Sequence, residues 1–254
     1  MSHSTNERKS LPFLVYVLAM GTFLMGTSEF VVAGLLPDIA SNLAIDISEA
    51  GLLVTAFAIG MIATPLIAVA APEMPERTTL LLALAVYSAG HIVVALTDDL
   101  SIILVARFVT ALATGAFWSI AASVASRVAG PDASVRAIGL VLSGGILATV
   151  IGVPLGSVAG QLVGWRGPFW ILAVLAVLAS VPIARVVPGG RSSSTVIPLR
   201  SQLAAVTTAR LWVVMTACVL ISTAVMSTYS FIAPLLTERS GLSAGLLPVG
   251  LAVF

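Results

Sequence analysis

The sequence is built from long apolar segments, each separated from the next by a short polar or charged stretch. The first runs from Leu11 to Leu36, and further apolar segments lie near 51–71, 79–96, 100–122, 137–160, 168–187 and 211–236. A helix needs about 20 apolar residues to cross the hydrocarbon core of a bilayer. With 59% hydrophobic and only 9% charged residues, the chain is predicted to be an all-α integral membrane protein with about seven crossings in a lipid bilayer.

The first apolar segment follows Arg8 and Lys9, as the apolar region of a signal peptide would. A signal peptide has an apolar region of only about 7–15 residues. We therefore expect the first segment to remain as an uncleaved transmembrane helix. An eighth apolar segment begins near Leu242.

The basic residues predict how the chain is oriented, because cytoplasmic loops are enriched in Lys and Arg. One set of alternate loops, with the N-terminus, carries most of the cations: Arg8, Lys9, Arg77, Arg127, Arg136, Arg185, Arg191, Arg200 and Arg210. The opposite loops carry acidic residues and only two cations: Asp38, Asp46, Glu49, Asp98, Asp99, Glu238, Arg166 and Arg239. The N-terminus is predicted to be cytoplasmic, and the membrane that the chain crosses is predicted to be the inner (plasma) membrane.

A polar stretch rich in Pro, Gly and Ser at 188–210 predicts a flexible linker between two units. The expected organisation is a cytoplasmic N-terminus at 1–10, a six-helix bundle at 11–187, this cytoplasmic linker, and the start of a second bundle at 211–254. A faint repeat supports the division, since FVVAGLLP in the first segment is echoed by FIAPLL in the seventh. We expect the chain to be truncated, lacking most of a C-terminal half.

Glu29 lies inside the first apolar segment, in MGTSEFVVAG. An ionisable group is costly in a membrane and usually faces the bundle interior or a watery cavity. A carboxyl group there can exchange its proton as its surroundings change, which suits a proton carrier. The alternative is a neutral acid that only packs the bundle.

Arg107, in LVARFVTALATGAF, is the arginine placed well inside a span, and its guanidinium stays charged. It is a second candidate for proton or substrate coupling. The alternative is that it extends to the nearby interface, as long cationic side chains do near helix ends.

The fifth segment contains Gly152, Gly156 and Gly160 at four-residue spacing, so they share one helix face and permit close approach of a neighbouring helix. Pro154 lies between them and favours a kink. Tight packing and a hinge between two transport states are both open interpretations.

Weaker candidates are His91 and Gln161, polar residues that could line a cavity or simply bond across the bundle. Asp38, after Pro37, is expected to cap the first helix or begin its loop. Cys218, the single cysteine, is interpreted as a small packing residue and excludes an internal disulfide.

Several function classes lack their signals in this sequence. The net charge is +1 and Lys9 is the only lysine, so neither a nucleic-acid patch nor a phosphate-binding loop ending in Gly-Lys is present. Two distant histidines and one cysteine predict no metal site, and no nucleophile-base set indicates an enzyme. We expect no cofactor and no nucleic-acid partner.

Four segments carry a family resemblance: MGTSEFVVAGLLPDIA in the first span, EAGLLVTAFAIGM entering the second, RFVTALATGAFW in the fourth, and GVPLGSVAGQLVGWRGPFW across the fifth and sixth. With them the chain resembles the major facilitator superfamily, and within it the twelve-span drug:proton antiporters and the chloramphenicol-efflux proteins of actinobacteria. The resemblance runs from about Leu11 to the end. It implies a major facilitator fold, here an N-terminal six-helix bundle plus helix 7 and the start of helix 8.

The resemblance also implies roles for residues. Glu29 would handle protons or a cationic substrate, and Arg107 would couple protons. Gly152, Pro154 and Gly156 match the glycine-proline motif of antiporters, with a valine between the first two.

The resemblance implies that the loop after the second span acts as a cytoplasmic gate. The sequence of this loop departs from the family pattern. Thr64 stands where a glycine is expected, and Glu73 and Glu76 stand where arginines are common, leaving Arg77.

The function expected from these features is export of a small amphipathic, chloramphenicol-like drug in exchange for protons, by alternating access. Two alternatives are open. The cargo could instead be a sugar, nucleoside or other metabolite. Or the chain could be a truncated membrane protein that does not transport, either a degraded gene product or a partner subunit that pairs with a second half.

Overall fold

The computed structural model describes residues 10–70, 74–187 and 209–230, and this part of the chain is almost entirely helical. In order along the chain, the helices are α1 (Phe13–Leu43), α2 (Ile47–Ala70), α3 (Glu76–Leu96), α4 (Leu100–Ala129), α5 (Ser134–Leu147), the π-helical η1 (Ala148–Gly152), α6 (Val153–Val163), α7 (Gly167–Val186) and α9 (Ala209–Ser230).

Six membrane-length helices are found in the described residues, counting α5, η1 and α6 as one helix over Ser134–Val163. They lie at the six positions where the first six spans are predicted, which confirms the all-α membrane fold. The seventh predicted span is helical as α9, but its apolar part, Trp212–Val225, is shorter. The end of that span and the eighth segment lie outside the described residues.

The expectation that Asp38 caps α1 or begins a loop is wrong. The helix continues through Pro37 and Asp38 to Leu43. A proline costs the helix one backbone hydrogen bond, and transmembrane helices tolerate this where neighbouring groups compensate. The helix ends instead at Ala44, whose left-handed conformation (φ 53°) lets its N–H bond to the carbonyl of Ala40.

The fourth span is also longer than predicted, because α4 continues to Ala129 rather than ending near 122. Its start is fixed by Asp99, whose carboxylate accepts hydrogen bonds from the backbone N–H groups of Ser101 (2.8 Å) and Ile102 (3.3 Å). Its last turn contains Arg127, which forms an ion pair with Glu76 at the start of α3.

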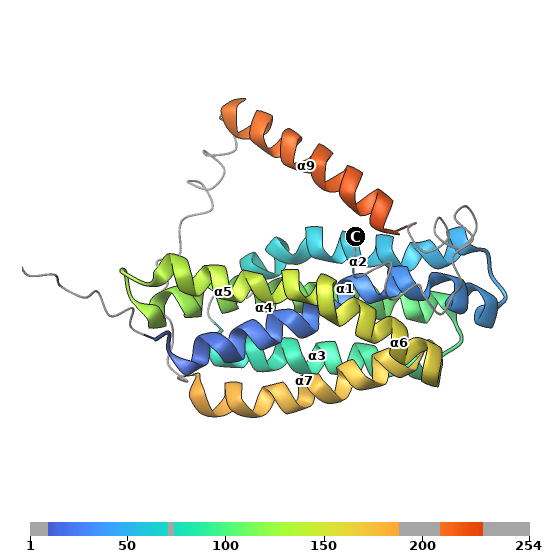
Figure 1. The fold of residues 1–254 in the computed structure, drawn as a ribbon, viewed down its shortest axis with the longest axis horizontal. Helices are drawn as coiled ribbons and strands as arrows, with labels where there is room; N and C mark the ends of the chain where they lie inside the picture. Colours follow the sequence, from blue (N-terminus) through green and yellow to red (C-terminus); the bar gives the residue numbers. More distant parts are fainter. Residues whose placement is uncertain (1–9, 71–73, 188–208, 231–254) are drawn as a thin grey trace, which may run out of the picture.

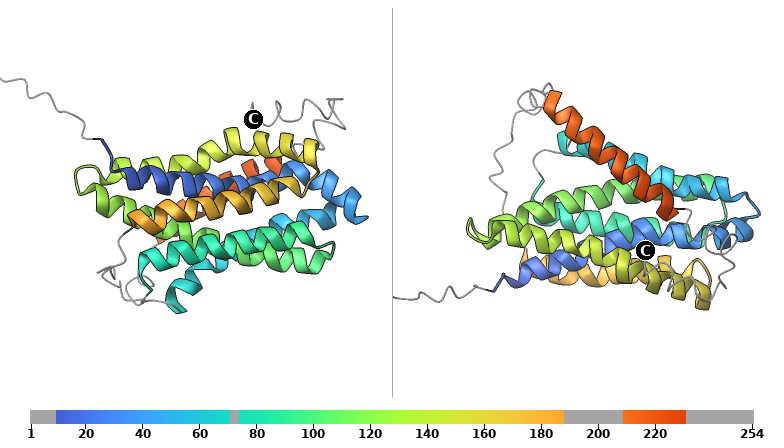
Figure 2. Two further views of the ribbon diagram at one scale, coloured as in Figure 1. Left: turned by 90° about the horizontal axis from the view of Figure 1, so that it is seen from below. Right: turned by 45° about the horizontal axis from the view of Figure 1, so that its top comes forward.

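The helices from α1 to α7 run up and down in one bundle (Figures 1 and 2). The α4–α5 turn and the end of α7 lie at the same end of the bundle as the start of α1. The α1–α2, α3–α4 and α6–α7 connections lie at the opposite end (Figure 1). The two sets of loops with different charge are therefore at opposite ends of the bundle.

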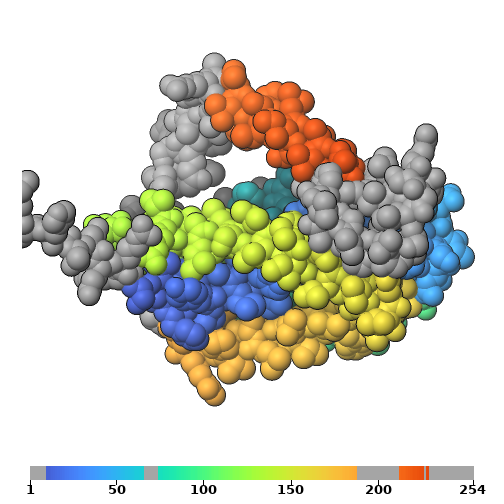
Figure 3. All heavy atoms as spheres, viewed as in Figure 1, coloured from blue at the N-terminus to red at the C-terminus, as the bar shows by residue number. Residues whose placement is uncertain are grey.

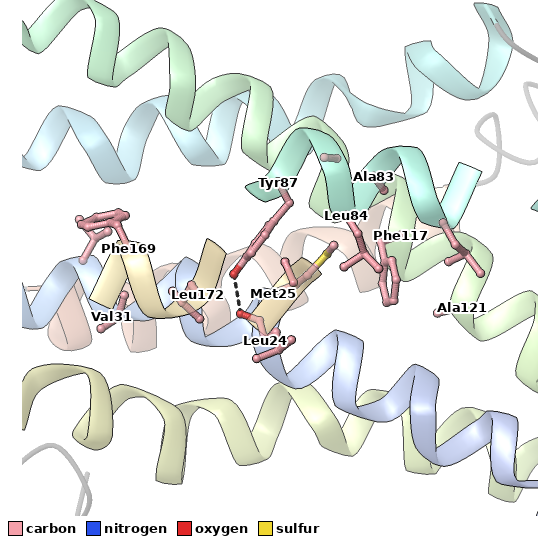
Figure 4. Close-up of a cluster of buried hydrophobic side chains, with 14 of the residues drawn as sticks. Leu24, Met25, Val31, Ala83, Leu84, Tyr87, Phe117, Ala121, Phe169 and Leu172 are labelled. Carbon is pink, nitrogen blue, oxygen red and sulfur yellow. Dashed lines mark hydrogen bonds between the residues drawn. The ribbon is translucent and has the colours of Figure 1, made fainter. Parts of the chain in front are cut away.

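Helix α1 is the centre of the packing and contacts α2, α4, α5, α6 and α7. Figure 4 shows part of the core, in which Leu24, Met25 and Val31 of α1 lie among side chains of α3, α4 and α7. Many apolar side chains on α5, α6 and α7 are instead exposed, among them Leu155, Leu162 and Val174. An apolar exterior of this kind suits lipid contact.

Candidate functional site

Arg107 is enclosed in the middle of the bundle, with only 1% of its surface exposed. Its Nη1 donates hydrogen bonds to the carbonyl oxygen (3.3 Å) and the hydroxyl oxygen (3.1 Å) of Ser28 on α1. The guanidinium also lies over the ring of Phe57 on α2, 4.4 Å from the ring centroid. Nε and Nη2 are buried and have no hydrogen-bond partner in the described structure. One edge of the guanidinium is thus anchored, and the other is buried without a hydrogen-bond partner.

His91 on α3 extends this network from the other side of Ser28. Its Nε2 lies 2.6 Å from the hydroxyl oxygen of Ser28, and its Nδ1 lies 2.7 Å from the carbonyl oxygen of Tyr87. The imidazole packs between the rings of Tyr87 (4.1 Å between centroids) and Phe169 (5.7 Å). His91 is therefore a buried, fully bonded side chain that joins α3 to α1.

Tyr87 makes a second connection between α3 and α1. Its hydroxyl donates to the carbonyl oxygen of Leu24 at 2.8 Å, as drawn in Figure 4. A buried tyrosine normally finds such a partner for its hydroxyl. Together with the Ser28–His91 contact, this bond holds α3 against α1 over more than one helical turn.

Glu29 follows Ser28 on α1 and is partly buried. Its charge and that of Arg107 are close enough to attract each other. Among the ion pairs formed by described residues within 4.0 Å, however, none joins these two. The structure therefore brings the two predicted intramembrane charges into one region without direct contact.

The predicted glycine stripe lies against α1. A side chain at Gly152 would collide with Thr27, one at Gly156 with Val31, and one at Gly160 with Leu35. The chain is π-helical over Ala148–Gly152, just before Pro154. A wider turn of this kind accommodates the proline ring and often marks a functional position.

An apolar cavity of about 180 Å³ adjoins this stripe. It lies between α1, α6 and α7, and is lined by Thr27 and Val31 on one side and by Leu155, Ile171 and Leu175 on the others. On the face seen in Figure 3, α1 is visible between the α5–α6 segment and α7. The lining offers apolar contacts rather than charged groups.

Two of the predicted gate residues, Glu76 and Arg77, lie at the end of the bundle that holds the start of α1. Glu76 is the first residue of α3, is buried, and forms a two-pronged ion pair with Arg127 in the last turn of α4. Arg77 is partly exposed, and Glu73 lies outside the described residues. Thr64 packs closely on Gly115, where α2 meets α4.

Other predicted residues lie elsewhere. Gln161 is on an exposed part of α6, and Cys218 is exposed on α9. The described residues contain no group of three or more His, Cys, Asp or Glu side chains that could hold a metal ion.

Four residues of the site were not among those predicted from the sequence: Ser28, Tyr87, Phe57 and Arg127. Ser28 could have been identified, because it is a polar residue next to Glu29 within an apolar span. Phe57 had none, because an aromatic side chain in an apolar helix looks like ordinary core.

Comparisons with known proteins agree with this architecture. A family model described as Major Facilitator Superfamily matches residues 18–254. A chloramphenicol resistance protein from Streptomyces lividans is 39% identical over 248 residues, which are 96% of this chain and 63% of that protein. A probable sugar efflux transporter from Mannheimia succiniciproducens is 32% identical over 251 residues, 95% of this chain and 61% of that protein.

The fold is also similar to a solved structure of a bacterial homolog of the human lysosomal transporter Spinster, in an inward-facing and unoccupied conformation. The TM-score is 0.77 at 16% identity, over 95% of this chain and 59% of that one. The chain spans about three fifths of the length of each of these proteins.

Proposed function

Because the chain belongs to the Major Facilitator Superfamily, we propose that it is a transporter. In this proposal it exports a small amphipathic drug that resembles chloramphenicol, in exchange for protons. The observation that carries the proposal is the pair of intramembrane charges, Glu29 and the enclosed Arg107, close together but not in contact. Intramembrane ionisable groups mark proton and substrate pathways. The similarity to a chloramphenicol resistance protein supports the cargo.

In this proposal Glu29 carries the proton. When protonated, its carboxyl group is neutral and makes no ion pair. When it loses the proton, its carboxylate is attracted to Arg107, whose Nε and Nη2 atoms have no other hydrogen-bond partner in the described structure. The exchange of these two arrangements is the step that links proton movement to a change in helix packing.

The change in packing requires two halves that move against each other around a central site. The six-helix bundle of this chain would be one half, and a second bundle beyond the 188–210 linker would be the other. Gly152, Pro154 and Gly156 would form the hinge, since the side chains of Thr27 and Val31 on α1 pack directly against Gly152 and Gly156. The N-terminus would be cytoplasmic and the membrane would be the inner (plasma) membrane.

A second candidate keeps the fold and changes the cargo to a sugar, nucleoside or other metabolite. The specific support is the 32% identity to a probable sugar efflux transporter. Competition with a panel of drugs and sugars against labelled chloramphenicol separates the two candidates. Competition by sugars alone favours the second.

The experiment that tests the proposal measures drug accumulation in cells expressing the complete reading frame that contains this sequence. We expect lower chloramphenicol accumulation than in empty-vector cells, and loss of that difference when an uncoupler dissipates the proton gradient. A difference that persists unchanged with the uncoupler would show that export is not proton-coupled. No difference at any drug tested would remove the drug as cargo.

A further inference from the structure

With a neutral imidazole, the hydrogen bonds around His91 have only one consistent direction. The carbonyl oxygen of Tyr87 can only accept, so Nδ1 of His91 carries the hydrogen of their 2.7 Å contact. In a neutral imidazole the other nitrogen, Nε2, is then an acceptor. The hydroxyl of Ser28 must therefore donate its hydrogen to Nε2 across 2.6 Å.

This direction decides what Ser28 offers to Arg107. Because its hydrogen points to His91, the hydroxyl oxygen presents its lone pairs to Arg107, whose Nη1 donates at 3.1 Å. The backbone carbonyl of Ser28 accepts from the same nitrogen at 3.3 Å. Without an acceptor at position 91, the hydroxyl would be free to turn its hydrogen toward the guanidinium, and this anchor would weaken.

The other sides of the guanidinium are also constrained. Phe57 on α2 covers one face, and the buried Nε and Nη2 edge has no partner in the described structure. The charged and titratable groups around this network are Glu29 from α1, and Tyr87 and His91 from α3. Of these, Glu29 is the anion.

We propose that Ser28 and His91 are positioning residues that anchor the Nη1 side of Arg107, so that its Nε and Nη2 atoms keep no other partner and can receive the carboxylate of Glu29. This proposal rests on the proposed function, in which Glu29 exchanges protons. Neither residue carries the proton itself. His91 acts as a neutral acceptor, and its effect reaches Arg107 through the hydroxyl of Ser28.

The chain offers a matched control in Ser88. It is a buried serine on α3 whose hydroxyl donates to the carbonyl oxygen of Ala173 on α7 at 3.0 Å. Ser28→Ala and Ser88→Ala each remove a hydrogen bond that a buried serine hydroxyl donates to another helix, but only the Ser28 hydroxyl also accepts a hydrogen bond from Arg107. A purely structural role predicts similar effects for the two variants.

The functional test compares two modes of transport by the complete reading frame: uphill export driven by a proton gradient, and exchange of preloaded labelled drug for external unlabelled drug without a gradient. We expect Ser28→Ala and His91→Phe to lower the uphill rate about tenfold, since small misplacements of a reacting group cost this much or more. Drug-for-drug exchange should stay within about twofold, because the carrier then returns with drug bound and needs no proton exchange. Ser88→Ala should change neither mode selectively.

Rescue variants separate hydrogen bonding from shape. Ser28→Thr keeps the hydroxyl, and His91→Gln keeps one acceptor and one donor. Both should recover uphill export relative to Ser28→Ala and His91→Phe. Equal loss of both modes in Ser28→Ala and Ser88→Ala, with no rescue, would overturn the positioning role.

A measurement that needs no transport keeps the inference separate from the proposed function. Phenylglyoxal modifies accessible guanidinium groups, and mass spectrometry reports the extent at Arg107. We expect Arg107 to be protected in the unsubstituted protein and in Ser88→Ala, and to be modified several-fold faster in Ser28→Ala and His91→Phe. If the unsubstituted protein shows no proton-driven export, the proposed function fails, and this labelling alone decides whether Ser28 and His91 anchor Arg107. Equal labelling in all variants would overturn the inference.

Discussion

Removing Glu76 and removing Arg127 should lower the free energy of unfolding by different amounts, although the two residues form one ion pair. It joins the first residue of α3 to the last turn of α4. The side chain of Glu76 is only 8% exposed, whereas that of Arg127 is 49% exposed. The two charges therefore have unequal access to water once the pair is broken.

The expected magnitudes follow from this asymmetry. Arg127→Gln leaves a buried carboxylate without its cation, and breaking a buried pair in this way costs about 3–5 kcal/mol. We expect about 3 kcal/mol, since Glu76 lies at a helix end. Glu76→Gln leaves a half-exposed guanidinium that water can solvate, so its cost should lie at the lower end of the roughly 1.5–3 kcal/mol that a hydrogen bond to a charged group contributes.

The assay is unfolding by denaturant in detergent micelles, followed by loss of helical circular dichroism, on the complete reading frame. Asp98→Asn is the control, because Asp98 pairs with Arg166 at the opposite end of the bundle with its side chain 80% exposed. It should cost below about 1 kcal/mol. Equal costs for Arg127→Gln and Glu76→Gln, or costs no larger than that of Asp98→Asn, would refute the argument from burial.

Two other predictions concern the glycine stripe and the orientation of the chain. In the same unfolding assay, Gly152→Ala should destabilise the protein by about 1–3 kcal/mol, because the new methyl group collides with Thr27. Gly139→Ala is the control and should be neutral or slightly stabilising, because the space around Gly139 is open. Equal effects of the two variants would contradict the close approach of η1 to α1. In a Cys218→Ser background, an impermeant maleimide added to intact cells should label Asp98→Cys and not Asp132→Cys, and the reverse pattern would show that the N-terminus is outside.

Hydropathy predicted the positions of the helices because crossing a bilayer demands long apolar segments, and the first six spans were all placed within a few residues except at two ends. Those ends failed for a local reason. At Pro37 the general rule that proline stops a helix does not hold for α1, and α4 continues past the apolar part of its sequence to include Arg127. Apolar length alone cannot show where a helix continues into the interface.

The candidate site was only partly accessible from the sequence. Glu29 and Arg107 were identifiable because charges are rare in such segments. The contact between Ser28 and His91 was not, since it depends on how α1 and α3 are rotated about their axes, and their weakly amphipathic sequences do not determine that rotation. The partner of Glu76 was likewise hidden, although the alternation of spans already placed Glu76 and Arg127 at the same end of the bundle.

The most direct test of the central claim, that Glu29 exchanges protons for drug, is proton movement in everted membrane vesicles containing the complete reading frame. The vesicle interior is first acidified, and a pH-sensitive fluorescent dye reports proton release when chloramphenicol is added. We predict release with the unsubstituted protein and none with Glu29→Gln, whose amide cannot exchange a proton, while labelled drug still binds to both. Drug-dependent proton release of the same size in Glu29→Gln would contradict the account.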